Sequence, residues 1–91
     1  NELPKKEDYG LTSQIRRAAL SIILNYIEGF ARQKKLVMKN FLEISYSSLK
    51  ETKYLLYFSL KQEYLTNNDY DKLEQMSDRI GAMLWGILRK I

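Results

Sequence analysis

The sequence predicts an all-α fold, an antiparallel up-and-down bundle of long helices. Apolar residues recur every three or four positions through most of the 91 residues, which is the period of a helix and not of a strand. Only one proline and four glycines interrupt the chain, so long helices are favoured. The breaks between the periodic segments are short, and short connections join helices that lie antiparallel as neighbours. We therefore expect one helical-bundle domain over residues 1–91.

The first helix is expected over about 11–31 and has the most apolar surface. Gly10 and Thr12 are its expected start signals, because a threonine hydroxyl can accept a hydrogen bond from an exposed backbone N–H. Projected at about 100° per residue, its apolar side chains cover about two-thirds of the circumference, which is more than one buried face. Leu20 and Leu24 widen this arc. Together with two neighbouring apolar residues they are the candidates for an interface between copies of the chain: Leu20, Ile23, Leu24 and Ile27.

The second helix is expected over about 35–63 and the third over about 67–90. Small hydroxyl residues follow the apolar side of the second helix and allow close approach, since each hydroxyl can bond to a carbonyl of the preceding turn. These are Ser45, Ser48, Thr52 and Ser59. Thr66 is the expected N-cap of the third helix. Gly81 and Gly86 each lower helix stability by about 1 kcal/mol relative to Ala, so we expect close packing at both.

The composition excludes several classes of catalytic site. Without His or Cys, the chain has no imidazole base, no thiol nucleophile and no Glu-x-x-His di-metal site. The acids that could form a carboxylate-only metal site are better interpreted as solvated or salt-bridged: Glu28, Glu43, Glu51 and Glu74. No run of about 18 apolar residues indicates a membrane span. We expect a cytoplasmic protein that is not an enzyme and uses no metal or cofactor.

The net charge of +4 is concentrated in the first helix and the turn after it. Residues 11–40 contain one acid and six cations, which are the candidate nucleic-acid-binding residues: Arg16, Arg17, Arg32, Lys34, Lys35 and Lys39. Such a cluster binds phosphate without sequence preference, and repetition in a ring of subunits would add avidity. Two alternatives remain open. Arg17 would form a structural ion pair with a glutamate between helices or subunits, and the turn would be a solvated basic surface.

The tyrosines could stack on nucleic-acid bases, but their helical spacing beside Leu and Phe is more typical of the margins of packed surfaces. They include Tyr46, Tyr54, Tyr57 and Tyr64.

Several segments carry a family resemblance. They are residues 9–19 (YGLTSQIRRAA), Ser21-Ile22, Asn25, Glu28-Gly29, residues 41–51 (FLEISYSSLKE), Tyr64-Leu65 and residues 80–84 (IGAML). Together they resemble a bacterial family of four-helix-bundle proteins encoded by intervening sequences in large-subunit ribosomal RNA genes. The accessory protein of diversity-generating retroelements is a related branch. The resemblance covers nearly the whole chain.

The resemblance implies a four-helix bundle that assembles into a homopentameric ring. In the retroelement branch it also implies a basic surface that contacts a reverse transcriptase and nucleic acid. By position, the basic residues that matter would be Arg16, Arg17, Arg32, Lys34 and Lys35. We therefore expect an oligomeric accessory or scaffold protein that binds RNA or DNA. The alternative is a purely structural or protein-binding oligomer with no nucleic-acid role.

Two departures from the family pattern have structural consequences. Ile23-Leu24 stand where the family commonly has Pro-Ser, which removes a helix kink and adds apolar surface. Family members also carry another helix upstream of the Leu3-Pro4 region, which this sequence lacks. Three helices alone are expected to leave a groove that the missing helix or a partner would fill.

Overall fold

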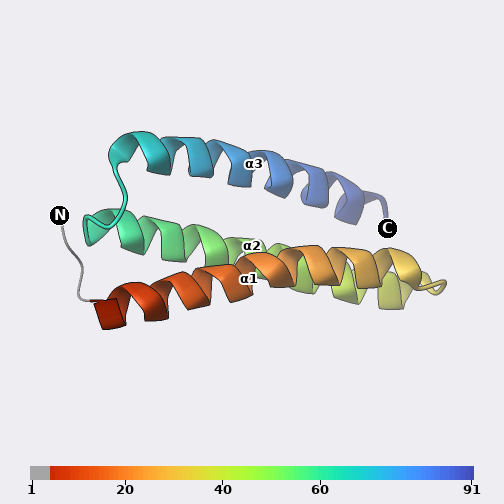
Figure 1. Ribbon diagram of the computed structural model, residues 1–91. Coiled ribbons are helices and arrows are strands. Elements are labelled where there is room, and N and C mark those ends of the chain that lie inside the picture. The colour runs from red at the N-terminus through yellow and green to blue at the C-terminus, as the bar shows by residue number, and fades with distance from the viewer. Residues whose placement is uncertain (1–4) are drawn as a thin grey trace.

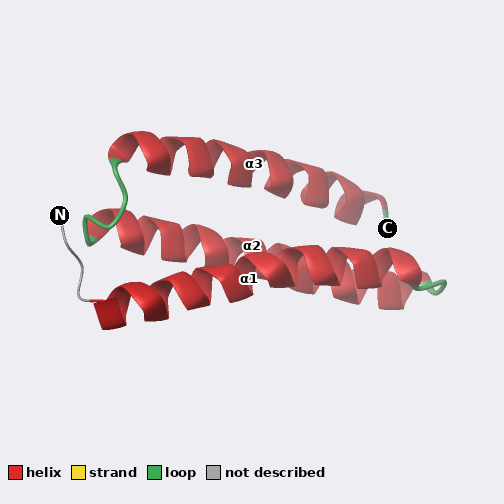
Figure 2. Ribbon diagram, viewed as in Figure 1, coloured by secondary structure: helices red, strands yellow, loops and turns green. Residues whose placement is uncertain are grey.

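The computed structural model describes the backbone of residues 5–91 and the side chains from residue 10 onward. This part of the chain forms three helices and no strand: α1 (Lys5–Ala31), α2 (Lys35–Lys61) and α3 (Asn67–Lys90). Neighbouring helices run in opposite directions (Figure 1). Short connections join them at the two ends of an elongated body (Figure 2). The predicted all-α helical architecture is confirmed.

The middle helix, α2, holds the structure together. It packs against α1 and against α3, whereas α1 and α3 make no close backbone approach to each other within the described residues. The buried core follows from this arrangement, since its side chains come from all three helices: Ile22, Leu42, Leu49 and Leu84. A helix that contacts two neighbours must bury two sides, and α2 contains most of the buried residues in the described part of the chain.

Two of the predicted helix ends are wrong. The first helix begins at Lys5 and continues through Gly10 and Thr12, which were the expected start signals. Neither residue forces a break, since one Gly lowers helix stability by about 1 kcal/mol and Thr only weakly disfavours a helix. The second helix ends at Lys61, because Glu63 adopts a left-handed backbone with φ of 64°.

The start of α3 lies where the sequence predicts it. Thr66 has an extended backbone, and its hydroxyl accepts a hydrogen bond from the Asp69 N–H at 3.1 Å. Asp69 lies in the first turn, where an acid interacts favourably with the positive end of the helix dipole. The last turn contains Arg89 and Lys90, which suit the negative end.

Small residues bring α1 and α2 close together. The hydroxyl of Ser45, which is fully buried, donates across the helix pair to the Ile22 carbonyl at 2.7 Å. The Ser21 and Ser48 hydroxyls share a hydrogen bond of 2.7 Å. The other two hydroxyls bond back within α2, as predicted: Thr52 donates to the Ser48 carbonyl and Ser59 to the Leu55 carbonyl. The expected close approach along this side of α2 is therefore confirmed.

The two glycines of α3 lie in different surroundings. A Cβ atom on Gly81 would come within 3.2 Å of Leu49 Cδ2, so the predicted close packing exists there. A Cβ atom on Gly86 would meet nothing within 4 Å, so the same prediction is wrong for Gly86. The difference arises because Gly81 faces α2 and Gly86 does not.

Candidate interaction surfaces

The structure does not bring the six candidate cations together. Arg16 and Arg17 lie 15 or 16 residues before Arg32, which is about 22 Å along α1. The Arg17 Nη2 atom is 2.7 Å from the Glu51 Oε2 atom, so this ion pair joins α1 to α2. The predicted alternative, in which Arg17 forms a structural ion pair with a glutamate of another helix, is therefore confirmed. Arg16 is exposed and forms no ion pair with any described side chain.

The remaining four candidates surround the connection between α1 and α2. Arg32 is held in place, because its guanidinium lies 2.6 Å from Glu28 Oε1 and 5.1 Å from the centre of the Phe41 ring. Lys34 is the N-cap residue of α2, whose first turn contains no acid. Within residues 10–91, no carboxylate lies within ion-pair distance of the three lysines of this group: Lys34, Lys35 and Lys39. They are available to an anion outside the chain.

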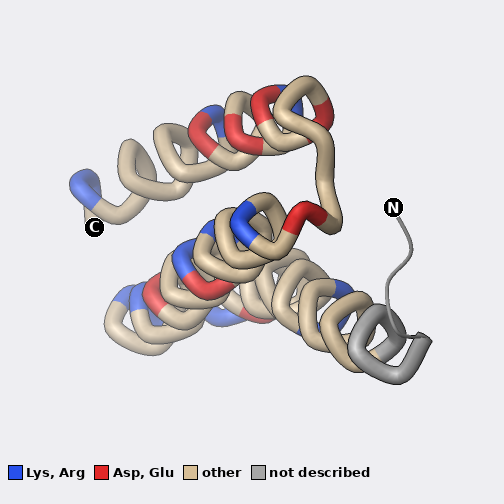
Figure 3. Tube along the Cα trace, turned by 90° about the vertical axis from the view of Figure 1, so that its left-hand side faces the viewer, with Lys and Arg blue, Asp and Glu red and all other residues tan. Residues whose placement is uncertain are grey.

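Two further cations belong to the same end of the bundle and were not predicted as binding residues. The C-terminal end of α3, with Arg89 and Lys90, lies at the end of the molecule where α1 joins α2 (Figure 1). We call this end, with the three lysines above, the basic end. Acids instead occupy the N-terminal half of α3 (Figure 3): Asp69, Asp71, Glu74 and Asp78. The predicted antiparallel order of the helices is the signal that could have placed Arg89 and Lys90 at this end.

An ion-pair cluster fastens α3 to α2 near the middle of the bundle. Lys53 Nζ lies 2.6 Å from Asp78 Oδ1 and 3.7 Å from Glu74 Oε2. The hydrogen bond to Asp78 raises the pKa of Lys53, against the opposing effect of its partial burial. Burial also raises the pKa of Tyr70, and the charge of Glu74 adds to that rise. The cluster stabilises the pairing of α2 and α3.

The four acids considered as metal ligands are accounted for by ordinary interactions. Glu28, Glu51 and Glu74 each pair with a cation, and Glu43 is exposed. No group of three or more acids among the described residues is placed to hold a metal ion. None of the helices in the described part of the chain is long and apolar enough to cross a membrane.

The four candidate interface residues share one side of α1, which we call the outer face. Leu20, Ile23, Leu24 and Ile27 are 51–57% exposed in the single chain. On the opposite side of the helix, Ala18 and Ile22 are buried against the rest of the bundle. The outer face is therefore a contiguous apolar surface that this one chain leaves open to water, and apolar patches of this kind commonly mark interaction sites.

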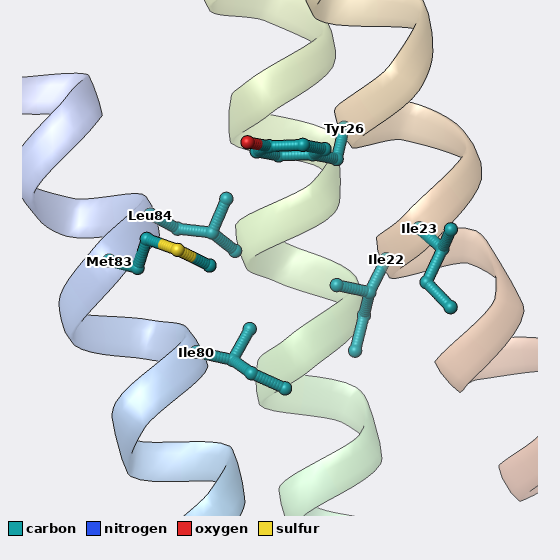
Figure 4. Close-up of a pocket in the computed structure, with 6 residues that line it drawn as sticks. All are labelled: Ile22, Ile23, Tyr26, Ile80, Met83 and Leu84. Carbon is teal, nitrogen blue, oxygen red and sulfur yellow. The ribbon is translucent and has the colours of Figure 1, made fainter.

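A second apolar surface lies between α1 and α3, where three helices leave a groove. A pocket of about 230 Å³ opens there, lined by Ile22, Ile23, Tyr26, Ile80, Met83 and Leu84. The side chains of Tyr26, Ile80 and Leu84 reach into the space between the helices (Figure 4). Ile23 lies at its rim, and Met83 is 54% exposed. The groove expected from the sequence is present.

The family of this chain follows from its sequence. Residues 1–86 match the sequence model of a family described as 23S rRNA-intervening sequence protein. The chain belongs to that family. Among solved structures it is similar to a protein of unknown function from the S23 ribosomal protein family of Bacteroides thetaiotaomicron, with a TM-score of 0.83 and 29% sequence identity. The similarity covers 86% of this chain and 72% of that one. No curated protein matches.

This member of the 23S rRNA-intervening sequence protein family carries its Ile23-Leu24 departure on the outer face. The helix is unbroken there, as expected without the proline, and both side chains are more than half exposed. These two side chains therefore add to the apolar outer face. The Leu3-Pro4 region, where the additional family helix would join, lies outside the described residues.

Proposed function

We propose that this protein is a non-enzymatic, self-associating helical scaffold whose basic end binds nucleic acid. The observation that carries the proposal is the group of lysines with no carboxylate partner among the described side chains: Lys34, Lys35 and Lys39. Arg89 and Lys90 add two charges at the same end. Lysines that are not engaged within the chain can contact phosphates, and such contacts give affinity that depends on salt and little on sequence.

Self-association makes a small basic patch effective. One subunit offers only a few phosphate contacts, which is too few for tight binding at physiological salt. The exposed outer face, which includes Leu24 and Ile27, supports association between copies. Each added copy repeats the basic end, so a nucleic acid long enough to reach several copies gains avidity. By the family resemblance, we propose a homopentameric ring.

The same resemblance extends the proposal to partners and location. We propose a cytoplasmic accessory protein that works beside a nucleic-acid enzyme, of which the reverse transcriptase of the retroelement branch is an example. Arg16, Arg17 and Arg32 would have secondary roles, since two of them already contact glutamates. Breaking an existing ion pair offsets part of the gain from a new phosphate contact.

The alternative function is a protein-binding oligomer with no nucleic-acid role. The groove between α1 and α3 favours it, because an apolar channel between two helices suits the apolar face of a third helix. A partner held there would remain bound after nuclease treatment and at high salt, since burial of apolar surface does not depend on screening. Loss of every captured partner under those conditions would count against the alternative.

The test of the basic end compares two double variants with the same change in charge. Lys34→Glu with Lys35→Glu alters the basic end, whereas Lys61→Glu with Lys72→Glu alters the opposite end of the bundle. We expect the first pair to weaken binding of fluorescently labelled RNA and DNA at least tenfold for every sequence, and to lower the salt slope by about 1.8 for duplex DNA. The control pair should lose much less affinity for the same RNA and DNA.

The measurement is fluorescence anisotropy between about 50 and 200 mM salt. Two results would overturn the proposal. One is an affinity that does not change with salt, which would mean that phosphate contacts do not hold the complex. The other is an equal loss in both double variants, which would mean that only net charge matters.

A further inference from the structure

A second pocket lies on the seam between α2 and α3, on the side of α3 away from the apolar groove. Its volume is about 230 Å³, and its walls include Tyr46, Lys50, Lys53, Asp78 and Trp85. Unlike the groove, this pocket combines aromatic rings with charged groups. A volume of this size can hold one planar ring, and the charged groups beside the aromatic rings make the pocket less suited to the apolar face of a helix than the groove is. Neither the ion pairs that fasten α3 nor the predicted packing of the tyrosines explains why Trp85 lies open here.

Two aromatic side chains form the exposed wall of this pocket. The rings of Tyr46 and Trp85 lie 6.2 Å apart between centroids, with an angle of 38° between their planes. Tyr46 packs on the core, which fixes its position, whereas Trp85 is 53% exposed. Trp side chains are usually well buried, so an indole this open offers an apolar ring face to a ligand.

Cations lie on both sides of the aromatic pair along α2. Lys50 Nζ is 5.2 Å from the centre of the Tyr46 ring and has no carboxylate partner within the described chain. The spacings of four, seven and four residues place Lys35, Lys39, Tyr46 and Lys50 on one face of α2. Lys39 lies about 10 Å from Tyr46 along the helix axis, towards the basic end. The lysine row therefore runs from the basic end past the pocket.

Two acids lie near this row and limit its charge. Asp78 lines the pocket, but its carboxylate is neutralised by Lys53 at 2.6 Å. Glu43 is exposed on the same side of α2, four residues after Lys39. The two positive charges of Lys39 and Lys50 exceed the single negative charge of Glu43. The surface is therefore suited to an anionic chain that also presents planar rings.

We propose that the Tyr46–Trp85 pocket stacks an unpaired base of single-stranded nucleic acid, with Lys39 and Lys50 contacting phosphates on either side. The inference rests on the proposed function and assigns the class of nucleic acid that the basic end alone leaves open. Bases in a duplex are stacked on each other and cannot enter such a pocket, whereas single-strand-binding sites combine aromatic faces with a row of cations in this way.

The test uses Trp85 as its own reporter, because it is the only tryptophan in the chain. The full chain is titrated with oligothymidylate, with oligouridylate and with a blunt DNA duplex, and tryptophan fluorescence is recorded beside anisotropy of the labelled strand. We expect single strands to quench the fluorescence and the duplex to leave it nearly unchanged. The two single strands distinguish DNA from RNA as the preferred source of the base.

Two variants and two matched controls locate the site. Tyr46→Leu and Lys50→Glu should each weaken single-strand binding about tenfold. Phe58→Leu removes another exposed ring of α2, and Lys61→Glu removes another ammonium that lies over a tyrosine, 5.4 Å from the Tyr57 ring centre. Both controls should bind as the unaltered chain does. If Tyr46→Leu misfolds by circular dichroism, Lys50→Glu and the fluorescence titration still decide the question.

The outcomes separate this inference from the proposed function. The stacking site is overturned if single-strand binding leaves Trp85 fluorescence unchanged, or if Lys50→Glu does not weaken that binding. In both cases the proposal that the basic end binds nucleic acid still holds. Equal quenching by the duplex contradicts the single-strand assignment. A fluorescence change that follows protein concentration alone would assign the pocket to a protein interface and overturn the inference. If no nucleic acid binds at any salt concentration, both proposals fail.

Discussion

At the scale of single residues, the polar contacts show which pairings a helical period can predict. Contacts within one helix follow from spacing, as for Thr52 and Ser59, whose hydroxyls bond to carbonyls of the preceding turn. The partner of Arg17 was not predictable in this way. Glu28 lies eleven residues further along the same helix and is too distant to pair with it, and the structure pairs Arg17 with Glu51 on α2. That choice depends on the register between α1 and α2, which one helix does not encode.

The Lys53 cluster predicts how stability changes at alkaline pH. The folded-state pKa of Lys53 is raised above its ordinary value of 10.5, so its contribution is fully present below that pH and is lost as pH rises through the folded pKa. The raised pKa of Tyr70 acts in the same direction. The free energy of unfolding should therefore fall above about pH 10. The effect should be modest, because Lys53 is partly exposed.

Urea unfolding of Lys53→Met between about pH 7 and 11 measures this contribution. The stability difference from the unaltered chain should shrink as pH passes the ordinary lysine range. Lys72→Met is the matched control, since Lys72 has no carboxylate partner in the described part of the chain. A difference for Lys53→Met that stays constant to the highest pH would contradict the role of the cluster.

At the scale of the elements, local start signals predicted the beginning of α3 correctly and the beginning of α1 wrongly. The N-cap hydroxyl of Thr66 and the acid Asp69 marked the start of α3 correctly. At the start of α1, Gly10 and Thr12 predict a boundary, but the helix runs through both residues. A weak helix former interrupts a helix only if a competing turn is more stable, and such a turn depends on surroundings beyond the local sequence.

The two glycines of α3 make an element-scale prediction with opposite expectations. Gly86→Ala should stabilise the fold by up to about 1 kcal/mol, because helix propensity improves and a Cβ atom meets nothing within 4 Å. Gly81→Ala brings a Cβ atom within 3.2 Å of Leu49, so the repacking of a core leucine should cancel that gain or reverse it. Urea unfolding of both variants compares them directly. Loss of stability in Gly86→Ala would mean that another surface packs there.

At the scale of the whole molecule, the fold was predictable and the surfaces were predictable only in part. Periodicity and short connections predicted the helices, and the family resemblance agrees with the match over residues 1–86. The sequence also indicated which side of α1 is too apolar for a single chain. It could not reveal that Trp85 lies beside Tyr46, because that contact depends on how α3 lies along α2, which is a tertiary property.

The outer face makes the prediction on which the scaffold proposal depends most. Light scattering at micromolar concentration should give a mass several times the 10.8 kDa of one chain, and five times that value for the proposed ring. Leu24→Glu and Ile27→Glu should shift the protein to smaller species, because a buried, unpaired carboxylate is strongly unfavourable. Tyr54→Glu is the control, since Tyr54 is 64% exposed on α2, outside the outer face.

Loss of assembly should also lower affinity for nucleic acid, although Leu24→Glu and Ile27→Glu leave every lysine of the basic end in place. The reason is that a single subunit makes few phosphate contacts, and only repeated copies convert them into avidity. Anisotropy on a long strand should therefore show a larger loss than on a strand that one subunit can cover. An unaltered chain that sediments as a monomer at micromolar concentration would refute the assembly and, with it, this coupling between the apolar and basic surfaces.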